Sequence, residues 1–255
     1  MPDKALVKKR FSRSLKTYSG EAEIQKLMAE KLTAMIVRRR TRFSRVLEIG
    51  AGTGILTGLL DESITWEQRI VNDLAEDCAE FHSRRKNTAF LPGDAENLGW
   101  GGGPFDLICS NAAFQWFENL PGFLRKIQNS MVQNGLLAFS AFGQENLAEL
   151  RTLTGQGLRY YPMRQLAGEL NSCGFTVLDS CEEILTRQFD DPLDLLKKMR
   201  RTGVTASVDK TWWTPRRLAE FRCAYIEHFG TADRRVKLTW HPIYILAEFE
   251  GGDPS

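Results

Sequence analysis

The chain has 255 residues, of which 42% are hydrophobic and 26% are charged, and its formal net charge is +2. It is long enough to bury a sizeable core as one domain, or as one domain with a small cap. A charge so near zero supports neither nucleic-acid binding nor membrane-surface binding by the whole molecule, and no apolar run approaches the roughly 20 residues that a membrane helix needs.

The five cysteines are scattered along the chain and include no C-x-x-C pair. This pattern predicts neither a disulfide framework nor a zinc site. The basic N-terminus lacks the apolar segment that follows it in a secretory signal. We therefore expect reduced thiols, no metal ion and a cytoplasmic location.

The N-terminal 45 residues are rich in lysine and arginine. In residues 5–18 the basic side chains are interleaved with apolar ones, and residues 21–37 place apolar side chains at helical spacing. A run of arginines at 38–45 follows. These charges fit either a solvated face or a docking surface for an acidic partner.

Residues 46–54 form the stretch on which the predicted fold depends. The pattern predicts the end of a buried strand at Val46–Ile49 and a glycine turn with φ > 0 at residues 50–54. It predicts a helix at residues 55–60. A strand, a glycine loop and a helix in this order are typical of a Rossmann-like nucleotide site at the carboxyl end of a parallel sheet.

Glu48 bears on the identity of the ligand. The spacing of Gly50, Gly52 and Gly54 differs from the G-x-G-x-x-G dinucleotide pattern, and a carboxylate beside the loop repels phosphate but suits a cation. The motif resembles motif I of the class I S-adenosylmethionine (SAM) methyltransferases. A second pattern, G-x-G-x-x-x-G through Gly52, Gly54 and Gly58, fits NADP sites loosely. The third possibility is that the glycines form a turn with only a structural role.

Two later strand ends supply the rest of the expected cofactor site. Asp73 ends a strand at 69–72, about 20 residues past the glycine loop, where a carboxylate accepts from both ribose hydroxyls and Leu74 packs on adenine. After a third strand at 88–91, Asp94 is expected to accept from the adenine amino group while the Ala95 N–H donates to the ring. A turn of this kind is also a common helix cap.

The fourth strand, Phe105–Asn111, should be buried on both faces. Ligands of α/β sheets bind at the carboxyl ends of strands, so the tail that carries Asn111, Gln115 and Trp116 should line the reaction centre. The aromatic side chains here either pack in the core or face the sulfonium through a cation–π contact.

Alternating strands and helices predict an α/β fold, a Rossmann-like class I methyltransferase with a seven-stranded, mostly parallel sheet, helices on both faces and a small helical cap. Helices are expected at 75–85 and 120–132, and strands at 136–142, 175–185 and 236–249. The domains expected are an N-terminal helical lid at 1–40, a SAM-binding core at 41–190, a helical cap insertion at 191–235 and the last core strand at 236–250.

Beyond the shared cofactor motifs, several further stretches are informative. They are K-R-F at 9–11 with Tyr18 and Gln25, S-N-A-A-F-Q-W-F at 110–117, F-S-A-F-G at 139–143 with Glu149 and Leu150, R-Y-Y at 159–161, R-R-T-G-V-T at 200–205 and T-W-H at 239–241. Together they resemble the malonyl-acyl-carrier-protein O-methyltransferases of early biotin synthesis, nearly from end to end. The chain departs from their pattern at Trp240, where Tyr is more common, and at Val204, where Ala is usual.

The resemblance implies that the free carboxylate of a malonyl thioester on acyl carrier protein attacks the methyl group of SAM. A carboxylic acid is already ionised at neutral pH, so the reaction needs orientation and an arginine that holds the carboxylate rather than a general base. The residues implied for catalysis are Tyr18, Gln115, Trp116, Arg159, Arg201 and His241. Those implied for SAM are Tyr18, Gln25, Glu48, Gly50, Gly52, Asp73, Leu74, Asp94, Ala95 and Asn111.

Among these residues, Arg159 is the first candidate for holding the carboxylate and Arg201 the second, although both also fit surface ion pairs. His241 also fits a hydrogen-bonded core histidine. Two rival functions share the fold: a carboxyl methyltransferase for a small free acid, of the trans-aconitate type, and a SAM-binding protein without activity. An NADP oxidoreductase is the rival with another cofactor. No nucleic-acid or membrane partner is expected.

Overall fold

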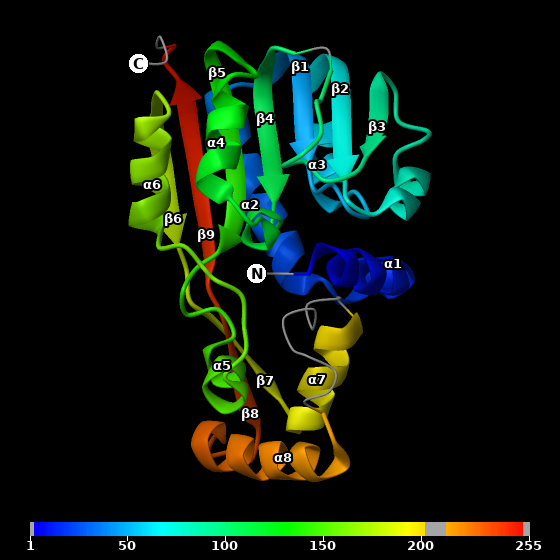
Figure 1. Cartoon of the computed structure of the whole chain (residues 1–255), viewed down its shortest axis with the longest axis vertical. Helices are drawn as coiled ribbons and strands as arrows, with labels where there is room; N and C mark the ends of the chain where they lie inside the picture. Colours follow the sequence, from blue (N-terminus) through cyan, green and yellow to red (C-terminus); the bar gives the residue numbers. More distant parts are fainter. Residues whose placement is uncertain (1–2, 102, 202–212, 252–255) are drawn as a thin grey trace.

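The computed structural model describes residues 3–101, 103–201 and 213–251. Its main feature is a seven-stranded sheet with the strand order β3-β2-β1-β4-β5-β9-β6 (Figure 1). The strands are β1 (Arg42–Ile49), β2 (Thr65–Asp73), β3 (Thr88–Pro92), β4 (Phe105–Asn111), β5 (Met131–Phe142), β6 (Phe175–Glu182) and β9 (Pro242–Phe249).

All strands of this sheet run parallel except β9, which lies antiparallel between β5 and β6. The strand order reverses between β1 and β4, and such a reversal opens a crevice beyond the carboxyl ends of the strands. The predicted fold class, with its mostly parallel seven-stranded sheet, is therefore confirmed.

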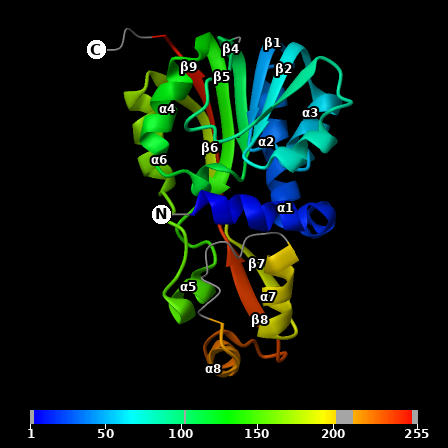
Figure 2. The ribbon, with the colours of Figure 1, turned by 45° about the vertical axis from the view of Figure 1, so that its right-hand side comes forward.

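Successive residues of the central strands point to opposite faces of the sheet, and both faces are covered. Val46 packs in one core with α2 (Glu23–Arg39) and α3 (Ile55–Ser63), whereas Leu47 packs in the other with α4 (Leu120–Gln128) and α6 (Met163–Ser172). Burial on both faces explains why these strands are almost continuously apolar. Figure 2 shows the sheet between the two helical layers.

A second group of elements, which we call the cap, lies below the sheet in Figures 1 and 2. It is built around a two-stranded antiparallel sheet. Its members are α5 (Ala148–Thr154), β7 (Leu185–Phe189), α7 (Pro192–Arg201), α8 (Pro215–Phe229) and β8 (Val236–Trp240). The first helix, α1 (Lys4–Glu21), lies between the cap and the carboxyl ends of β1, β2 and β3.

The cap makes two predicted strands differ from the structure. The strand expected at 175–185 ends at Glu182, and a separate strand, β7, begins at Leu185. The strand expected at 236–249 is split into β8 and β9 around His241. β6 and β9 pair in the main sheet, whereas β7 and β8 pair in the cap. The cap therefore begins before residue 191 and extends past residue 235, and both its strands were expected in the core.

Three local differences have simple causes. The helix expected at 75–85 is only a short 3-10 turn, η1 (Glu76–Phe81). The helix expected to reach residue 132 ends at Gln128, because β5 already begins at Met131. The turn at Asn134 lies inside β5, where a left-handed φ of 59° accompanies a register shift against β4. None of the helices among the described residues is long and apolar enough to span a membrane.

Candidate active site

A cleft opens at the carboxyl ends of β1, β2, β3 and β4, where the switch in strand order places it. Its empty volume, including the part open to solvent, is about 1270 Å³. The glycine loop forms one wall, and Val7, Phe11 and Tyr18 of α1 form another. The helix α1 therefore forms part of the wall of the cleft.

The glycine loop has the left-handed backbone that its sequence predicts. Gly50, Gly52 and Gly54 have φ values of 68°, 54° and 82°. A Cβ at Gly50 would lie 2.4 Å from the Cβ of Ala113, so the loop and the tail of β4 touch at a point where only glycine fits. The backbone of the loop is thus exposed to any ligand in the cleft.

Asp73 joins the end of β2 to this loop. One carboxylate oxygen accepts the backbone N–H of Gly52 at 2.8 Å, and the other accepts that of Ala75 at 2.8 Å. Burial raises the pKa of the carboxyl, while these two hydrogen bonds favour the ionised form. The Cys78 thiol also hydrogen-bonds to this carboxylate, and the acceptor capacity that remains lets Asp73 accept from a hydroxyl group of a ligand.

Glu48 is only 1% exposed and lies at the floor of the cleft. One of its oxygens accepts from the Thr57 hydroxyl at 2.9 Å, and the other, Oε2, is buried with no hydrogen-bond partner among the described residues. Burial raises the pKa of Glu48 to about 7, although the charge of Arg69 acts in the opposite direction. A buried acceptor without a partner suits a cationic or hydrogen-bond-donating ligand.

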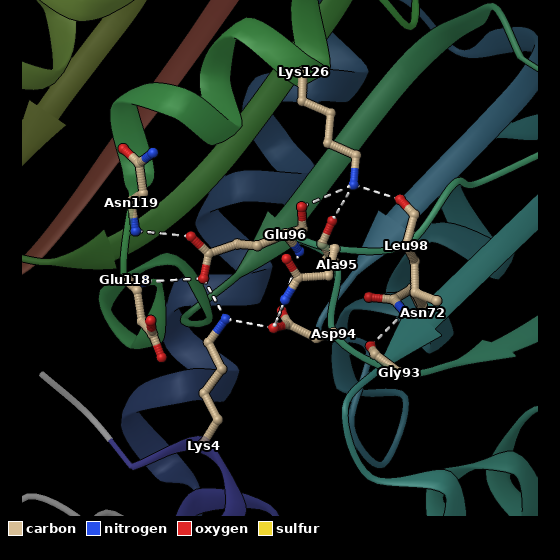
Figure 3. Close-up of polar contacts among 11 residues, drawn as sticks. Lys4, Asn72, Gly93, Asp94, Ala95, Glu96, Leu98, Glu118, Asn119 and Lys126 are labelled. Atoms are coloured by element: carbon tan, nitrogen blue, oxygen red, sulfur yellow. Dashed lines mark hydrogen bonds and ion pairs between the residues drawn. The ribbon is translucent and has the colours of Figure 1, made fainter.

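The loop after β3 is held by two lysines that reach it from opposite sides (Figure 3). Lys126 of α4 donates to the carbonyl groups of Ala95 at 2.7 Å and of Glu96 at 3.2 Å. Lys4 of α1 lies 2.6 Å from an oxygen of Asp94 and also contacts the carboxylate of Glu96. Asp94 is therefore shared between the cleft and α1.

Glu96 extends this cluster to the tail of β4. Its two oxygens accept the backbone N–H groups of Glu118 at 2.9 Å and Asn119 at 2.8 Å. Asn72 donates to the carbonyl groups of Leu91 and Gly93 from the neighbouring strand. The loop at 93–98 is thus fixed by contacts from β2, α4, α1 and the chain after β4.

The tail of β4 brings the remaining predicted residues to the cleft. Asn111 donates to the carbonyl group of Gln25 at 3.0 Å and accepts from the Ser140 hydroxyl at 2.6 Å. Gln115 donates to the Ala112 carbonyl at 2.5 Å, and its Oε1 is buried without a partner among the described residues. Gln25, Asn111, Gln115 and the half-buried Trp116 all line the cleft.

Tyr18 comes from α1 and packs edge-on against Phe11, with ring centroids 5.0 Å apart. Burial and the charge of Asp73 raise the pKa of the Tyr18 hydroxyl. The hydroxyl therefore remains protonated and can donate a hydrogen bond into the cleft at any physiological pH.

Three predicted catalytic residues lie outside the walls of the cleft. Arg201 is exposed and pairs with Glu21 at 2.9 Å, which is the surface ion pair considered from the sequence. Arg159 is exposed and lies over the ring of Tyr161, at 5.1 Å from its centroid. It makes no ion pair with any described residue, and its neighbours Leu158 and Tyr160 line the cleft, so Arg159 lies at the rim.

His241 is a hydrogen-bonded core histidine, 8% exposed, at the break between β8 and β9. Its Nδ1 accepts the backbone N–H of Glu145 at 3.1 Å, which leaves the proton on Nε2, and Nε2 lies 3.0 Å from the Glu182 carboxylate. A Cβ at Gly143 would lie 2.7 Å from the imidazole. The structure thus gives His241 the role of joining core and cap and does not bring it to the cleft.

Sequence reasoning missed several lining residues. Lys8 of α1 belongs to the basic segment at 5–18, Lys4 precedes that segment, and Phe142, Asn146 and Tyr160 belong to no cofactor motif. Asn146 is 1% exposed and donates to the Tyr160 hydroxyl at 3.0 Å. The R-Y-Y stretch was a signal for Tyr160, but nothing local pointed to Asn146. Residues 202–205 of the R-R-T-G-V-T stretch lie outside the described residues.

The comparisons with known proteins agree on the fold. A family model described as a methyltransferase domain matches residues 21–180. The solved structure of the YcgJ protein from Bacillus subtilis superposes with a TM-score of 0.63 at 15% identity, and the match covers 88% of this chain and 100% of that protein. At this identity the likeness shows the fold alone.

Two relatives named malonyl-acyl-carrier-protein O-methyltransferase are far more similar in sequence. The one from Chlorobium luteolum is 38% identical over 252 residues, and the match covers 96% of this chain and 95% of the relative. The one from Bacteroides fragilis is 37% identical over 251 residues, and here the chain spans about half (50%) of the relative's length. The chain therefore belongs to the malonyl-acyl-carrier-protein O-methyltransferase family.

Proposed function

We propose that this protein transfers the methyl group of SAM to the free carboxylate of a malonyl thioester carried by an acyl carrier protein. The products are the malonyl methyl ester, which would prime pimeloyl synthesis on the way to biotin, and S-adenosylhomocysteine. The observation that carries the proposal is that the chain is 38% identical, over 96% of its length, to a relative named malonyl-acyl-carrier-protein O-methyltransferase.

The walls of the cleft fit SAM. Glu48 presents a buried oxygen that lacks a partner, which suits a ligand that carries an ammonium and a sulfonium. Asp73 keeps acceptor capacity for a ribose hydroxyl, and the lining residues Leu74, Asp94 and Ala95 surround the place proposed for adenine. Gly50 and Gly52 line the cleft and have no side chain, so the ligand can lie against the backbone of the loop. The same cleft has carboxylates at places where an NADP site would have to bind phosphate, and carboxylates repel phosphate. The cleft therefore suits SAM better than NADP.

The reaction itself needs little from acid–base groups. The carboxylate oxygen forms a bond to the methyl carbon as the bond from that carbon to sulfur breaks, so the sulfonium becomes a neutral thioether and the carboxylate a neutral ester. No proton moves, because the acid is already ionised at neutral pH. Orientation of oxygen, carbon and sulfur in line is the main contribution that we assign to the protein.

The residues that hold the malonyl group are part of the proposal. Arg159 suits the carboxylate best, because it lies at the rim of the cleft and no described carboxylate neutralises it, whereas Arg201 is already paired with Glu21. Arginine binds a carboxylate through two parallel hydrogen bonds. Tyr18, Gln115 and Trp116 line the cleft and are proposed to bound the space in which the methyl group moves.

The test is mass spectrometry of malonyl-acyl carrier protein incubated with the purified protein and SAM. The proposal requires a mass gain of one methyl group that base hydrolysis of the ester removes. Acetyl-acyl carrier protein is the matched control, because it lacks only the free carboxylate and must gain nothing.

The other outcomes separate the rival functions. No gain on malonyl-acyl carrier protein, together with methylation of a small free acid, would reject the carrier-bound substrate and keep the chemistry. SAM binding without methylation of any acid would point to a protein without activity. Displacement of SAM by NADPH at equal concentration would contradict the cofactor assignment.

A further inference from the structure

The helix α1 has two faces with different chemistry. Val7, Phe11 and Tyr18 line the cleft, whereas Lys9, Arg13 and Lys16 are exposed. Residues at i, i+4 and i+7 lie on one side of a helix, so the three basic side chains form a single stripe. Arg200 at the end of α7 is also exposed, and α7 is joined to α1 by the bond from the Thr17 hydroxyl to the Arg201 carbonyl.

Among the residues that the structure describes, no carboxylate neutralises the positive charge of this stripe. Lys9, Arg13, Lys16 and Arg200 make no ion pair with any residue that the structure describes. The acidic residues that do pair nearby are already engaged by other cations, since Glu76 pairs with Lys8 and Glu21 pairs with Arg201. We call these four exposed cations the α1 stripe.

A second basic region lies at the wrong end of the molecule to serve the cleft. The arginines at 38–45 lie at the end of α2 and the start of β1, whereas the cleft is lined by the residues that end β1. Figure 1 shows the start of β1 at the end of the sheet away from α1. The eight residues of β1 separate Arg42 from Ile49 by about 23 Å at 3.3 Å per residue. Some of this charge is also used internally, because Arg39 pairs with Glu248 and Arg40 donates to the Asn134 carbonyl.

We infer that the α1 stripe is the docking surface for the acidic carrier protein. The inference rests on the proposed function, since it names where that substrate's protein part binds. The stripe has the complementary charge, and it lies one helix diameter, about 10 Å, from the inner face of α1 that bounds the cleft. A thioester on a flexible arm then needs only to pass around α1 to reach the cleft.

The experiment compares two charge-reversal variants of equal size. The first is K9E/R13E/K16E, on the α1 stripe. The matched control is R38E/R42E/K86E, three exposed cations that lie away from the cleft and make no ion pair with the described residues. Each variant changes the net charge by the same amount, so a general effect of charge cancels.

Each variant is assayed with malonyl-acyl carrier protein and with malonyl-pantetheine, which has the same thioester but no protein. The stripe variant should raise KM for the carrier-bound substrate about 30-fold, with kcat, KM for malonyl-pantetheine and SAM affinity within twofold of wild type. The control variant should keep KM within threefold. The neutral variant K9Q/R13Q/K16Q should be intermediate, and circular dichroism should show α1 helicity unchanged.

Failure of the inference is distinguishable from failure of the proposed function. If the wild type methylates neither malonyl substrate, the function fails and the docking surface falls with it. If the wild type is active and the stripe variant keeps its KM for the carrier-bound substrate, only the docking surface is wrong. A large rise in KM for R38E/R42E/K86E, with the stripe variant unaffected, would move the docking surface to the start of β1.

Discussion

The ammonium nitrogen of Lys4 lies 2.6 Å from a carboxylate oxygen of Asp94, although 90 residues separate them in the chain. Both side chains line the cleft, so this ion pair ties α1, the proposed lid, to the loop proposed to hold adenine. Their side chains are 18% and 21% exposed, which shields the pair partly from water. The position of α1 and the shape of the adenine loop are therefore coupled.

Lys4→Met should loosen this coupling. Because the lid loses its ion pair with the loop, we expect SAM to dissociate faster and its Kd to rise about fivefold, with the thermal midpoint lowered by only a few degrees. Stopped-flow displacement of bound SAM measures the rate. Lys16→Met on the same helix is the control and should leave the rate unchanged. Equal or slower dissociation from Lys4→Met would contradict the coupling.

The buried carboxyl of Glu48 should make SAM binding depend on pH. Its pKa is raised to about 7, and the cationic ligand favours the ionised form. SAM affinity should therefore fall as the pH falls, by about eightfold between pH 7.5 and 6. Isothermal titration at several pH values tests this, and Glu48→Gln should bind more weakly at pH 8 and show a flat profile. A wild-type profile equally flat over this range would count against the role.

Glu48 has the opposite consequence for the stability of the ligand-free protein. A carboxyl whose pKa is raised from 4.5 to about 7 by folding binds more protons in the native state between these pH values. Its contribution to stability is present below the unfolded pKa and is lost as the pH rises through the folded one. The free energy of unfolding of Glu48→Gln, taken relative to that of wild type, should thus rise by about 2 kcal/mol from pH 5 to pH 8. Urea denaturation at both pH values measures the difference.

Gly50→Ala should disrupt the cofactor loop. The residue has a φ of 68°, and an added Cβ would lie 2.4 Å from that of Ala113. We expect SAM affinity to fall about 5- to 30-fold, which corresponds to about 1–2 kcal/mol of backbone strain. Gly58→Ala is the matched control, because nothing lies within 4 Å of its added Cβ in α3, and it should be neutral or slightly stabilising. A loss of cofactor binding in Gly58→Ala instead would favour the NADP reading.

Arg159→Ala should raise KM for malonyl-pantetheine about tenfold and leave the Kd of SAM unchanged, because the carboxylate loses its counter-charge. Arg201→Ala should change this KM less than threefold, since its guanidinium is paired with Glu21. Steady-state kinetics with the small substrate keep carrier docking out of the comparison. Unchanged kinetics in Arg159→Ala would reject its assignment as the carboxylate-binding residue.

His241→Ala should cost stability rather than specific activity. The buried imidazole lies between the Glu145 N–H and the Glu182 carboxylate and packs on Gly143, so its removal loses two hydrogen bonds and the packing of the ring. We expect a loss of about 1–3 kcal/mol in urea denaturation. His228→Ala, at an exposed site on α8, is the control and should be neutral. A fall in kcat above tenfold at full stability would restore a catalytic role.

Much of the cofactor site follows from local sequence. Glu48, the glycines after it, Asp73 and Asp94 each stand at the end of a predicted strand, and a parallel sheet brings such ends together at one edge. Strand periodicity and glycine turns are properties of a few adjacent residues, so they can be read without knowing what packs against them. The fold class and the residues proposed for SAM were predictable for this reason.

Tertiary structure decided the rest, because it depends on contacts between distant residues. No local pattern shows that Lys4 reaches Asp94, that Arg201 pairs with Glu21 while Arg159 stays at the rim, or that His241 joins core and cap. The sequence predicts one strand at 236–249, and only the pairing partners separate β8 from β9. Local patterns fix the elements, whereas packing and charge pairing across the chain fix which side chains face the cleft.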